Sequence, residues 1–394
     1  MRVSKEIRGI LLMNASSNII FNFIGIFVNL YIWEKEKSIF DVTWFNLILF
    51  CVWSLSFAVG AKLLTKYSTK LLIRIIAGCG TITFLLLSFL HLDNRLLWIA
   101  IIAIPIGVMW GFYAIAQNIS LTALGKGEDF DAYFSYSTLI GQAVSILNPI
   151  FFAIVIKFFG YTGSFLLMFM FVAILLFVSF FIPNITIANE REPLFAKFRI
   201  SQVFSYSTLR WIVPSCLAAG IFLQFQGLFA LLFTFSVSEN KLIIALLNVG
   251  YACSTIVAMI LYRKLKTSNG TSLTIGMIFI SVGFLITLFP TAPVLVISNL
   301  LTTVGMFYFA SIWNARQFQI IAKHNAIEQV RILIWREWFL NIARIIMLLL
   351  ILTVRDFHGM SFILLMSLAL VCALVIPYFS GRSETTSMVN SKNM

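Results

Sequence analysis

Apolar residues fill the chain in long runs that recur from end to end, with short polar segments between them. A helix of about 20 apolar residues can cross the roughly 30 Å hydrocarbon core of a bilayer. A transmembrane barrel would instead show alternating segments of about ten residues. The chain is therefore predicted to be an all-α, polytopic membrane protein. Twelve transmembrane helices are predicted, at 9–33, 42–63, 71–91, 96–119, 134–158, 163–183, 211–236, 242–262, 272–290, 294–316, 332–354 and 359–379.

One connection is longer and more polar than the others, and it divides the predicted helices six and six. We therefore expect an N-terminal six-helix bundle at 1–183, a linker at 184–210 and a C-terminal six-helix bundle at 211–380. Phe195 and Phe198 lie among basic residues of the linker, a combination that favours a helix lying on the membrane surface. The polar tail at 381–394 is expected to be disordered.

The two halves repeat one another. Residues Phe21–Phe27 (FNFIGIF) align with Leu223–Phe229 (LQFQGLF) at an offset of 202 residues, and the same offset pairs Asn46 with Asn248 and Cys51 with Cys253. Shared offsets over consecutive helices are improbable by chance. Because six is an even number of helices, the two repeats have the same orientation in the membrane and are parallel repeats.

Composition and charge agree with this topology. The chain is 60% hydrophobic and 11% charged, with a mean hydropathy of +0.98, whereas soluble domains carry about 25% charge. Of its 28 Lys and Arg residues, 21 fall on the side of the predicted N-terminus and six on the opposite side. This asymmetry is the positive-inside pattern, which predicts both termini in the cytoplasm of a bacterial-type cell membrane. The net charge of +13 thus reflects topology and does not imply a nucleic-acid partner.

Twelve helices in two parallel halves resemble the major facilitator superfamily of transporters, in its bacterial, 12-span type. The connection between helices 2 and 3, Gly60–Lys70 (GAKLLTKYSTK), keeps the family's glycine and basic character, but Leu64 stands where the family has Asp. The exporter motif of helix 5 is also altered, since Asn148 precedes Pro149. The resemblance implies alternating access around a central cavity lined by helices 1, 4, 7 and 10.

The first helix carries a polar stripe at the helical period, formed by Asn14, Asn18, Asn22 and Asn29. Four asparagines are costly against lipid, so this face is expected to turn toward protein or water. Two interpretations stay open: the stripe lines a substrate cavity, or it makes hydrogen bonds between helices. The repeat keeps a polar residue, Gln224, at the position equivalent to Asn22.

Helices 4 and 10 add aromatic and amide side chains that could bind the apolar and polar parts of a small solute. Trp and Tyr are also common at membrane interfaces, which is the alternative interpretation. The candidates are Trp110, Tyr113, Gln117, Tyr308 and Asn314.

The strongest chemical pattern is a charged face on the eleventh helix. Glu337, Asn341 and Arg344 fall within about 60° on a helix, with Arg336 beside them. An ion inside a membrane helix is costly and therefore a functional hypothesis by default. Arg344 is expected to bind an anionic group or to pair with a buried acid. Glu337 is expected to carry a proton or to form a cytoplasmic gate together with Arg336 and the basic residues of the 2–3 connection, Lys62 and Lys66.

These patterns favour a secondary transporter of a small acidic, zwitterionic or amphipathic solute, with efflux as the expected direction and protons as a candidate coupling ion. A non-coupled facilitator or exchanger, a lipid flippase, and a non-transporting membrane sensor or scaffold stay open as alternatives. The cysteines and histidines show no metal-ligand spacing, and no cluster of acids and histidines indicates an enzyme. We expect no cofactor and no metal, with solute and bilayer as partners of a monomer.

Overall fold

The computed structural model describes residues 5–90, 92–124, 128–187, 194–195, 198, 201, 209–265, 268–321 and 323–392. Within these ranges all regular structure is helical, as predicted. Ten helical segments there are long and apolar enough to cross a membrane. The prediction of an all-α, polytopic membrane fold is thereby confirmed, while the number twelve stays a prediction.

Two elements explain why ten membrane-spanning segments are found in the described residues where the sequence predicts twelve. α6 (Glu128–Val178) includes a continuous apolar segment of 43 residues, about twice the length that one crossing needs. Its backbone breaks at Gly160, where φ is +68°, a left-handed conformation that glycine adopts without a steric penalty. α12 (Ala326–Ile351) is not among the ten, because Arg336, Glu337 and Arg344 make it more polar than the others.

The chain divides into two compact units. Unit 1 comprises residues 1–193 and 240–249, and unit 2 comprises residues 194–239 and 250–394. The first division therefore lies inside the segment predicted as the linker.

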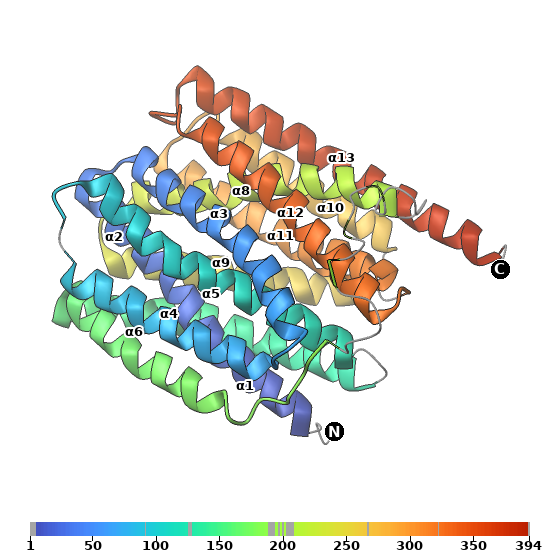
Figure 1. Ribbon diagram of the computed structural model, residues 1–394. Coiled ribbons are helices and arrows are strands. Elements are labelled where there is room, and N and C mark those ends of the chain that lie inside the picture. Colours follow the sequence, from blue (N-terminus) through green and yellow to red (C-terminus); the bar gives the residue numbers. More distant parts are fainter. Residues whose placement is uncertain are drawn as a thin grey trace. The chain divides into compact units, whose positions relative to one another are not determined.

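Unit 1 begins with α1 (Lys5–Phe23), which continues through a π-helical segment, η1 (Ile24–Val28), into α2 (Asn29–Glu36). A π-helical turn leaves backbone carbonyls out of register, and the side chain of Asn29 donates to the carbonyl of Gly25 over 3.0 Å. The remaining helices are α3 (Ile39–Leu64), α4 (Thr69–Phe89), α5 (Arg95–Leu124) and α6 (Figure 1).

Unit 2 begins with a short 3₁₀ turn, η2 (Leu209–Trp211), followed directly by α8 (Ile212–Val237). Then come α9 (Lys241–Leu265), whose first residues belong to unit 1, α10 (Asn269–Ile286), α11 (Ala292–Ile321), α12, and α13 (Met360–Lys392). Asn325 precedes α12, and its side chain accepts a hydrogen bond from the backbone of Glu328 over 2.9 Å. This N-cap starts α12 about one and a half turns before the predicted start at 332.

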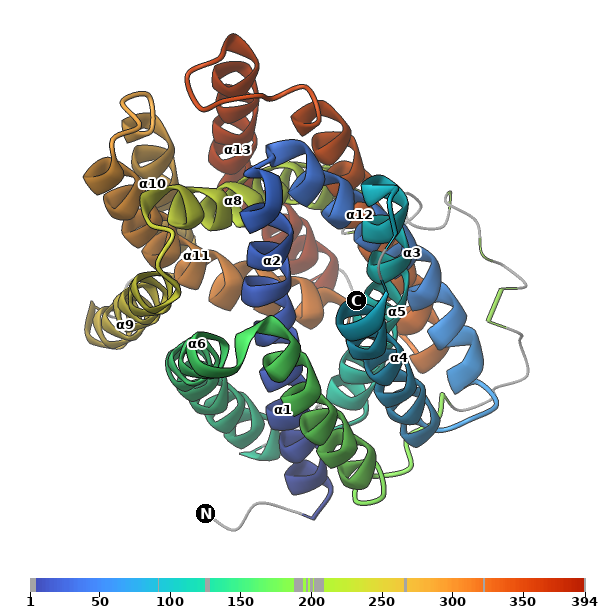
Figure 2. The same ribbon diagram turned by 90° about the vertical axis from the view of Figure 1, so that its left-hand side faces the viewer.

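Glycines allow close helix packing in both units. A Cβ at Gly107 of α5 would lie 2.7 Å from the carbonyl oxygen of Leu49 on α3, and these helices run side by side in Figures 1 and 2. In the repeat, Gly305 of α11 packs against the backbone of Gly276 on α10. Side chains at these positions would force the helices apart.

The linker and the tail differ in how far the structure describes them. Most of 184–210 lies outside the described residues, including the expected surface helix, although Leu194 and Phe195 form a turn. The expected disordered tail at 381–394 is instead helical as far as Lys392, because α13 continues beyond its apolar part (Figure 1).

Candidate functional site

A cluster of polar side chains lies inside unit 2, between α8, α11 and α12, and Arg336 is at its centre. Its guanidinium donates to the side-chain oxygen of Gln317 and, over 2.7 Å, to that of Asn314, both on α11. It also lies 5.1 Å from the ring centre of Trp313, within cation–π distance. Arg336 is only 6% exposed, so these contacts replace the water that a guanidinium otherwise requires.

The neighbours of Arg336 are themselves fixed by α8. The indole of Trp313 donates to the hydroxyl of Ser215 over 2.8 Å, and Gln317 contacts the sulfur of Cys216. One turn further along α8, a Cβ at Gly220 would lie 2.6 Å from Cβ of Ala343 on α12. The absence of a side chain at Gly220 therefore lets α8 approach α12 closely next to the cluster (Figure 1).

A second set of polar contacts continues along α12. Glu337 lies 3.8 Å from Nη1 of Arg336 and accepts a 3.5 Å hydrogen bond from Asn341. Asn341 in turn accepts from Nη1 of Arg344 over 3.3 Å. The face predicted from sequence is thus a continuous ladder from Arg336 to Arg344, with Glu337 and Asn341 buried at 6% and 0% exposure.

The charges of this cluster are unequal. The carboxylate of Glu337 lies beside Arg336 and is linked to Arg344 through Asn341, and Glu337 is the one acidic residue inside the twelve predicted membrane segments of the sequence. A buried ion is tolerated when charge and hydrogen bonds compensate it. The guanidinium groups of this cluster are therefore candidates for binding an anionic solute, as the sequence predicts for Arg344.

The asparagines of α1 bond to neighbouring helices of unit 1. Asn148 of α6 donates to the side chain of Asn22 over 2.9 Å and to the carbonyl of Ile19 over 3.1 Å. Asn14 donates to Ser137 of α6 over 2.8 Å and accepts a hydrogen bond from Asn18. These contacts are hydrogen bonds between helices, one of the two interpretations that the sequence left open for the stripe. A cavity-lining role for Asn18 and Asn22 stays a prediction.

The aromatic candidates of α5 join a stack in unit 1. Trp110 lies face to face with Phe21 of α1, with ring centres 4.2 Å apart, and with Trp53 of α3 at 5.3 Å. Tyr113 meets the edge of Phe21 at 4.9 Å. Trp110 and Tyr113 therefore pack against α1, and Trp110 also packs against α3, while a role of both residues in substrate binding stays a prediction.

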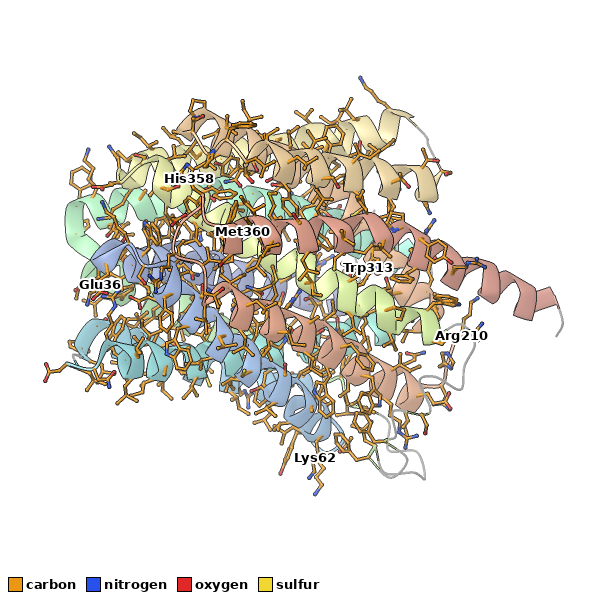
Figure 3. The ribbon with its side chains drawn as sticks, turned by 90° about the horizontal axis from the view of Figure 1, so that it is seen from above. Glu36, Lys62, Arg210, Trp313, His358 and Met360 are labelled. Carbon is orange, nitrogen blue, oxygen red and sulfur yellow. The ribbon has the colours of Figure 1, made fainter. Side chains whose placement is uncertain are left out.

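The other predicted residues are more dispersed. Tyr308 of α11 is buried against Gly276 and Tyr262, toward α10 and α9 rather than the Arg336 cluster. Gln224 is 5% exposed on α8, and Gln117 is partly exposed on α5. Lys62 and Lys66 are exposed at the end of α3 and in the turn after it, at the opposite end of unit 1 from Glu36 (Figure 3).

Sequence patterns missed Ser215 and Cys216 of the unit 2 cluster, and they placed Gln317 only at the end of its helix. Single serines and cysteines in apolar helices carry no distinctive signal. Gln317 falls at the predicted cytoplasmic end of its helix, where a polar residue is ordinary. The fact that α11 extends to Ile321 places this glutamine inside the helix and beside Arg336.

Comparison with known proteins gives relatives and fold neighbours. No protein-family model matches the chain. The uncharacterized protein YqgE of Bacillus subtilis is 24% identical over 344 residues, which span 82% of this chain and 76% of that protein. A POT family transporter, solved in complex with a thioalcohol-conjugated peptide, superimposes with a TM-score of 0.73 at 12% identity, covering 96% of both chains. The D-xylose–proton symporter has a TM-score of 0.66 at 13% identity, covering 94% of this chain and 97% of the symporter.

Proposed function

Because the chain has the fold of the major facilitator transporters, we propose that it is a secondary transporter that moves a small acidic or zwitterionic solute by alternating access. The fold neighbours were solved as transporters of peptides or sugar, so their likeness supports a transporter fold and leaves the substrate to the site residues. The proposed location is the cell membrane, with both termini in the cytoplasm, as the distribution of Lys and Arg predicts.

The unequal charge of the Arg336–Arg344 ladder carries this proposal. Arg336 is immobilised by Gln317, Asn314 and Trp313, so its role is to position α11 against α12 and to hold Glu337. Arg344 is partly exposed and lies at the far end of the ladder from Arg336. We propose that Arg344 binds the acidic group of the solute, with Asn341 orienting its guanidinium.

The aromatic stack of Phe21, Trp53 and Trp110 supports a solute with an apolar part. We therefore propose that the solute is an amphipathic metabolite. We propose export as the direction of its transport.

Glu337 is the proposed site of proton coupling. It lies 3.8 Å from Arg336 and accepts a hydrogen bond from Asn341, so its protonation would change the net charge of the ladder by one unit. In Glu337→Gln the side chain keeps its size and loses this charge. We expect solute flux driven by a pH gradient to disappear in this variant, whereas counterflow exchange without a gradient continues. Gradient-driven flux at the unmodified rate would exclude Glu337 as the proton carrier.

Reconstitution tests the function as a whole. The purified chain in liposomes is given a panel of radiolabelled monocarboxylates, amino acids and amphipathic acids, with and without an imposed pH gradient. We expect saturable flux of at least one acidic or zwitterionic solute above the rate in protein-free liposomes. A folded, reconstituted chain that moves no member of the panel would contradict the proposal and favour the membrane sensor or scaffold.

A further inference from the structure

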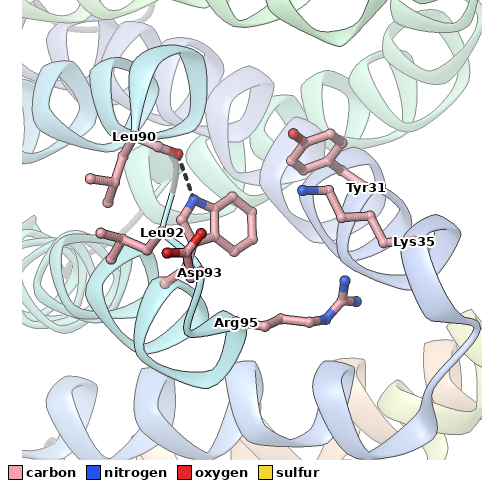
Figure 4. Close-up of a pocket in the computed structure, with 7 residues that line it drawn as sticks. Tyr31, Lys35, Leu90, Leu92, Asp93 and Arg95 are labelled. Carbon is pink, nitrogen blue, oxygen red and sulfur yellow. Dashed lines mark hydrogen bonds between the residues drawn. The ribbon is translucent and has the colours of Figure 1, made fainter.

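A second site of mixed charge lies in unit 1, away from the residues discussed so far. It is a pocket of about 290 Å³ where the end of α2 meets the connection between α4 and α5. Figure 3 shows Glu36, next to this pocket, and Lys62 at opposite ends of unit 1. The residues that line the pocket are Tyr31, Lys35, Leu90, Leu92, Asp93, Arg95 and Trp98 (Figure 4).

One wall of the pocket is aromatic and fixed. The ring centres of Tyr31 and Trp98 are 5.9 Å apart, and the indole of Trp98 donates to the carbonyl of Leu90 over 2.8 Å. The ammonium of Lys35 lies 5.0 Å from the Trp98 ring and 5.3 Å from the Tyr31 ring. The positive charge of Lys35 is thus held beside the aromatic rings that line the pocket (Figure 4).

A second positive charge is held by the fold itself. Arg95 bonds to Asp41 over 2.5 Å and to the carbonyl of Ile32 over 2.9 Å, and Glu36 lies 3.6 Å from it. Asp41 is 4% exposed whereas the side chain of Arg95 is 21% exposed, so the guanidinium is anchored in a partly buried ion pair. These contacts involve Nε and one N–H on each terminal nitrogen, and a guanidinium has five N–H groups in all. Asp41 and Glu36 already balance the charge of Arg95, so what it offers a ligand in the pocket is its two remaining N–H groups as hydrogen-bond donors.

The negative charge of the pocket comes from a different element. Asp93 is exposed and belongs to the α4–α5 connection together with Leu90 and Leu92, whereas Tyr31 and Lys35 come from α2 (Figure 4). The pocket therefore offers the ammonium of Lys35, the remaining N–H donors of Arg95, a separate carboxylate and an apolar wall. This combination matches a molecule with an acidic group, an amino group and an apolar part.

We propose that this pocket binds a small zwitterion with an apolar side group, of the kind represented by an aromatic amino acid. Its acidic group would bond to Lys35 and Arg95, its ammonium to Asp93, and its side group would pack on Trp98. The volume of about 290 Å³ lies at the small end of ligand pockets, which run from about 300 to 1,000 Å³, so the ligand is a metabolite rather than a peptide. A phosphoethanolamine lipid headgroup carries the same pair of charges. The site does not depend on the proposed transport.

Calorimetric titration of the full chain in detergent tests this site with L-phenylalanine as the probe. Two analogues remove one charge each: 3-phenylpropanoate lacks the ammonium, and phenethylamine lacks the carboxylate. We expect each analogue to bind at least about tenfold more weakly, since a hydrogen bond to a charged group contributes about 1.5–3 kcal/mol. O-phosphoethanolamine is titrated in parallel, and tighter binding of this compound would identify the lipid headgroup as the natural form of the zwitterion.

Variants locate the binding. Lys35→Gln and Asp93→Asn are expected to weaken binding of the zwitterion about tenfold. The matched control is Lys157→Gln, which removes another exposed lysine that lies over an aromatic ring but does not line the pocket, and it should leave binding unchanged. If Arg344→Ala abolishes binding while both pocket variants preserve it, the ligand occupies the unit 2 cluster and this inference is wrong. Absence of binding by both zwitterions at millimolar concentration would also overturn it.

Discussion

Arg336 and Arg344 lie eight residues apart on α12, about 12 Å along the helix, and their surroundings give them different roles. Arg336 is buried among Gln317, Asn314 and Trp313, where its charge serves to join α11 and α12. Arg344 is partly exposed and bonds to Asn341. At the scale of single residues, this difference in burial is the basis on which we propose that Arg336 joins helices and that Arg344 binds the ligand.

Replacing Arg344 tests this difference. Arg344→Ala should lower kcat/KM for an acidic solute by a factor of about 10 to 150, because a charge-assisted hydrogen bond contributes about 1.5–3 kcal/mol. Arg344→Lys keeps the charge but not the planar fork, so partial recovery is expected. Flux is measured in liposomes beside a neutral solute of similar size. An equal loss for both solutes would show that the arginine maintains structure and does not bind the acid.

Asn148 contributes to the stability of unit 1 through hydrogen bonds between two helices. Its bonds to Asn22 and to the carbonyl of Ile19 connect α6 to α1, and Asn148→Ala removes both. The expected loss in the free energy of unfolding is about 0.6 kcal/mol and at most about 2 kcal/mol, as for other polar contacts between membrane helices. Unfolding in mixed micelles measures this value. Asn184→Ala, at an exposed position, is the control, and equal stability of the two variants would contradict the assignment.

At the scale of helices, the same pairing recurs in the two units. In unit 1 the first helix, α1, packs along α6, which contains the fifth predicted segment; in unit 2 α8 packs along α12, the eleventh. The chemistry of the contact differs. The α1–α6 contact is formed by neutral amides such as Asn22 and Asn148, whereas the α8–α12 contact adjoins a charged cluster. Both units thus have polar side chains at this helix–helix contact, and in unit 2 the contact also adjoins the charged side chains of Arg336 and Glu337.

Gly220 controls the α8–α12 distance. The added methyl group of Gly220→Ala would meet the backbone of Leu340 and lie 2.6 Å from Cβ of Ala343, so the helices must separate. Overpacking of this kind costs about 1–3 kcal/mol, and we expect the loss in the unfolding free energy together with reduced solute flux.

Gly227 provides the matched control on the same helix. A Cβ at Gly227 meets nothing within 4 Å, so Gly227→Ala should be neutral or stabilise the chain by about 0.5–1 kcal/mol. If the two alanine variants had the same stability, close packing at Gly220 would not determine the α8–α12 distance.

At the scale of the whole molecule, the placement of charge predicts the orientation of the chain in the membrane. The side predicted to be cytoplasmic holds 21 of the 28 basic residues, including Lys66 in the turn between α3 and α4. Arg355, between α12 and α13, lies in a loop predicted to be external. Both side chains are exposed in their own units.

Cysteine labelling in intact cells tests this topology. In a background without reactive native cysteines, Arg355→Cys should react with a membrane-impermeant maleimide, whereas Lys66→Cys should react only after the membrane is opened. Opening the membrane before labelling supplies the control for accessibility. The reverse pattern would place the termini outside the cell.

Apolar runs, the internal repeat and loop charges predicted the helical membrane fold and the charged face of α12, because burial in lipid constrains every residue of a spanning helix. Glu337, Asn341 and Arg344 were found in this way, since their spacing is a property of one helix. The partners of Arg336 and the pocket around Arg95 join residues from separate helices, and no local pattern encodes such contacts. Tertiary packing alone decided that Gln317 holds Arg336, that Asn148 meets Asn22, and that Asp41 anchors Arg95 beside Lys35. In each case the reason is the same: a buried polar group must find its partner wherever the folded helices bring one within reach.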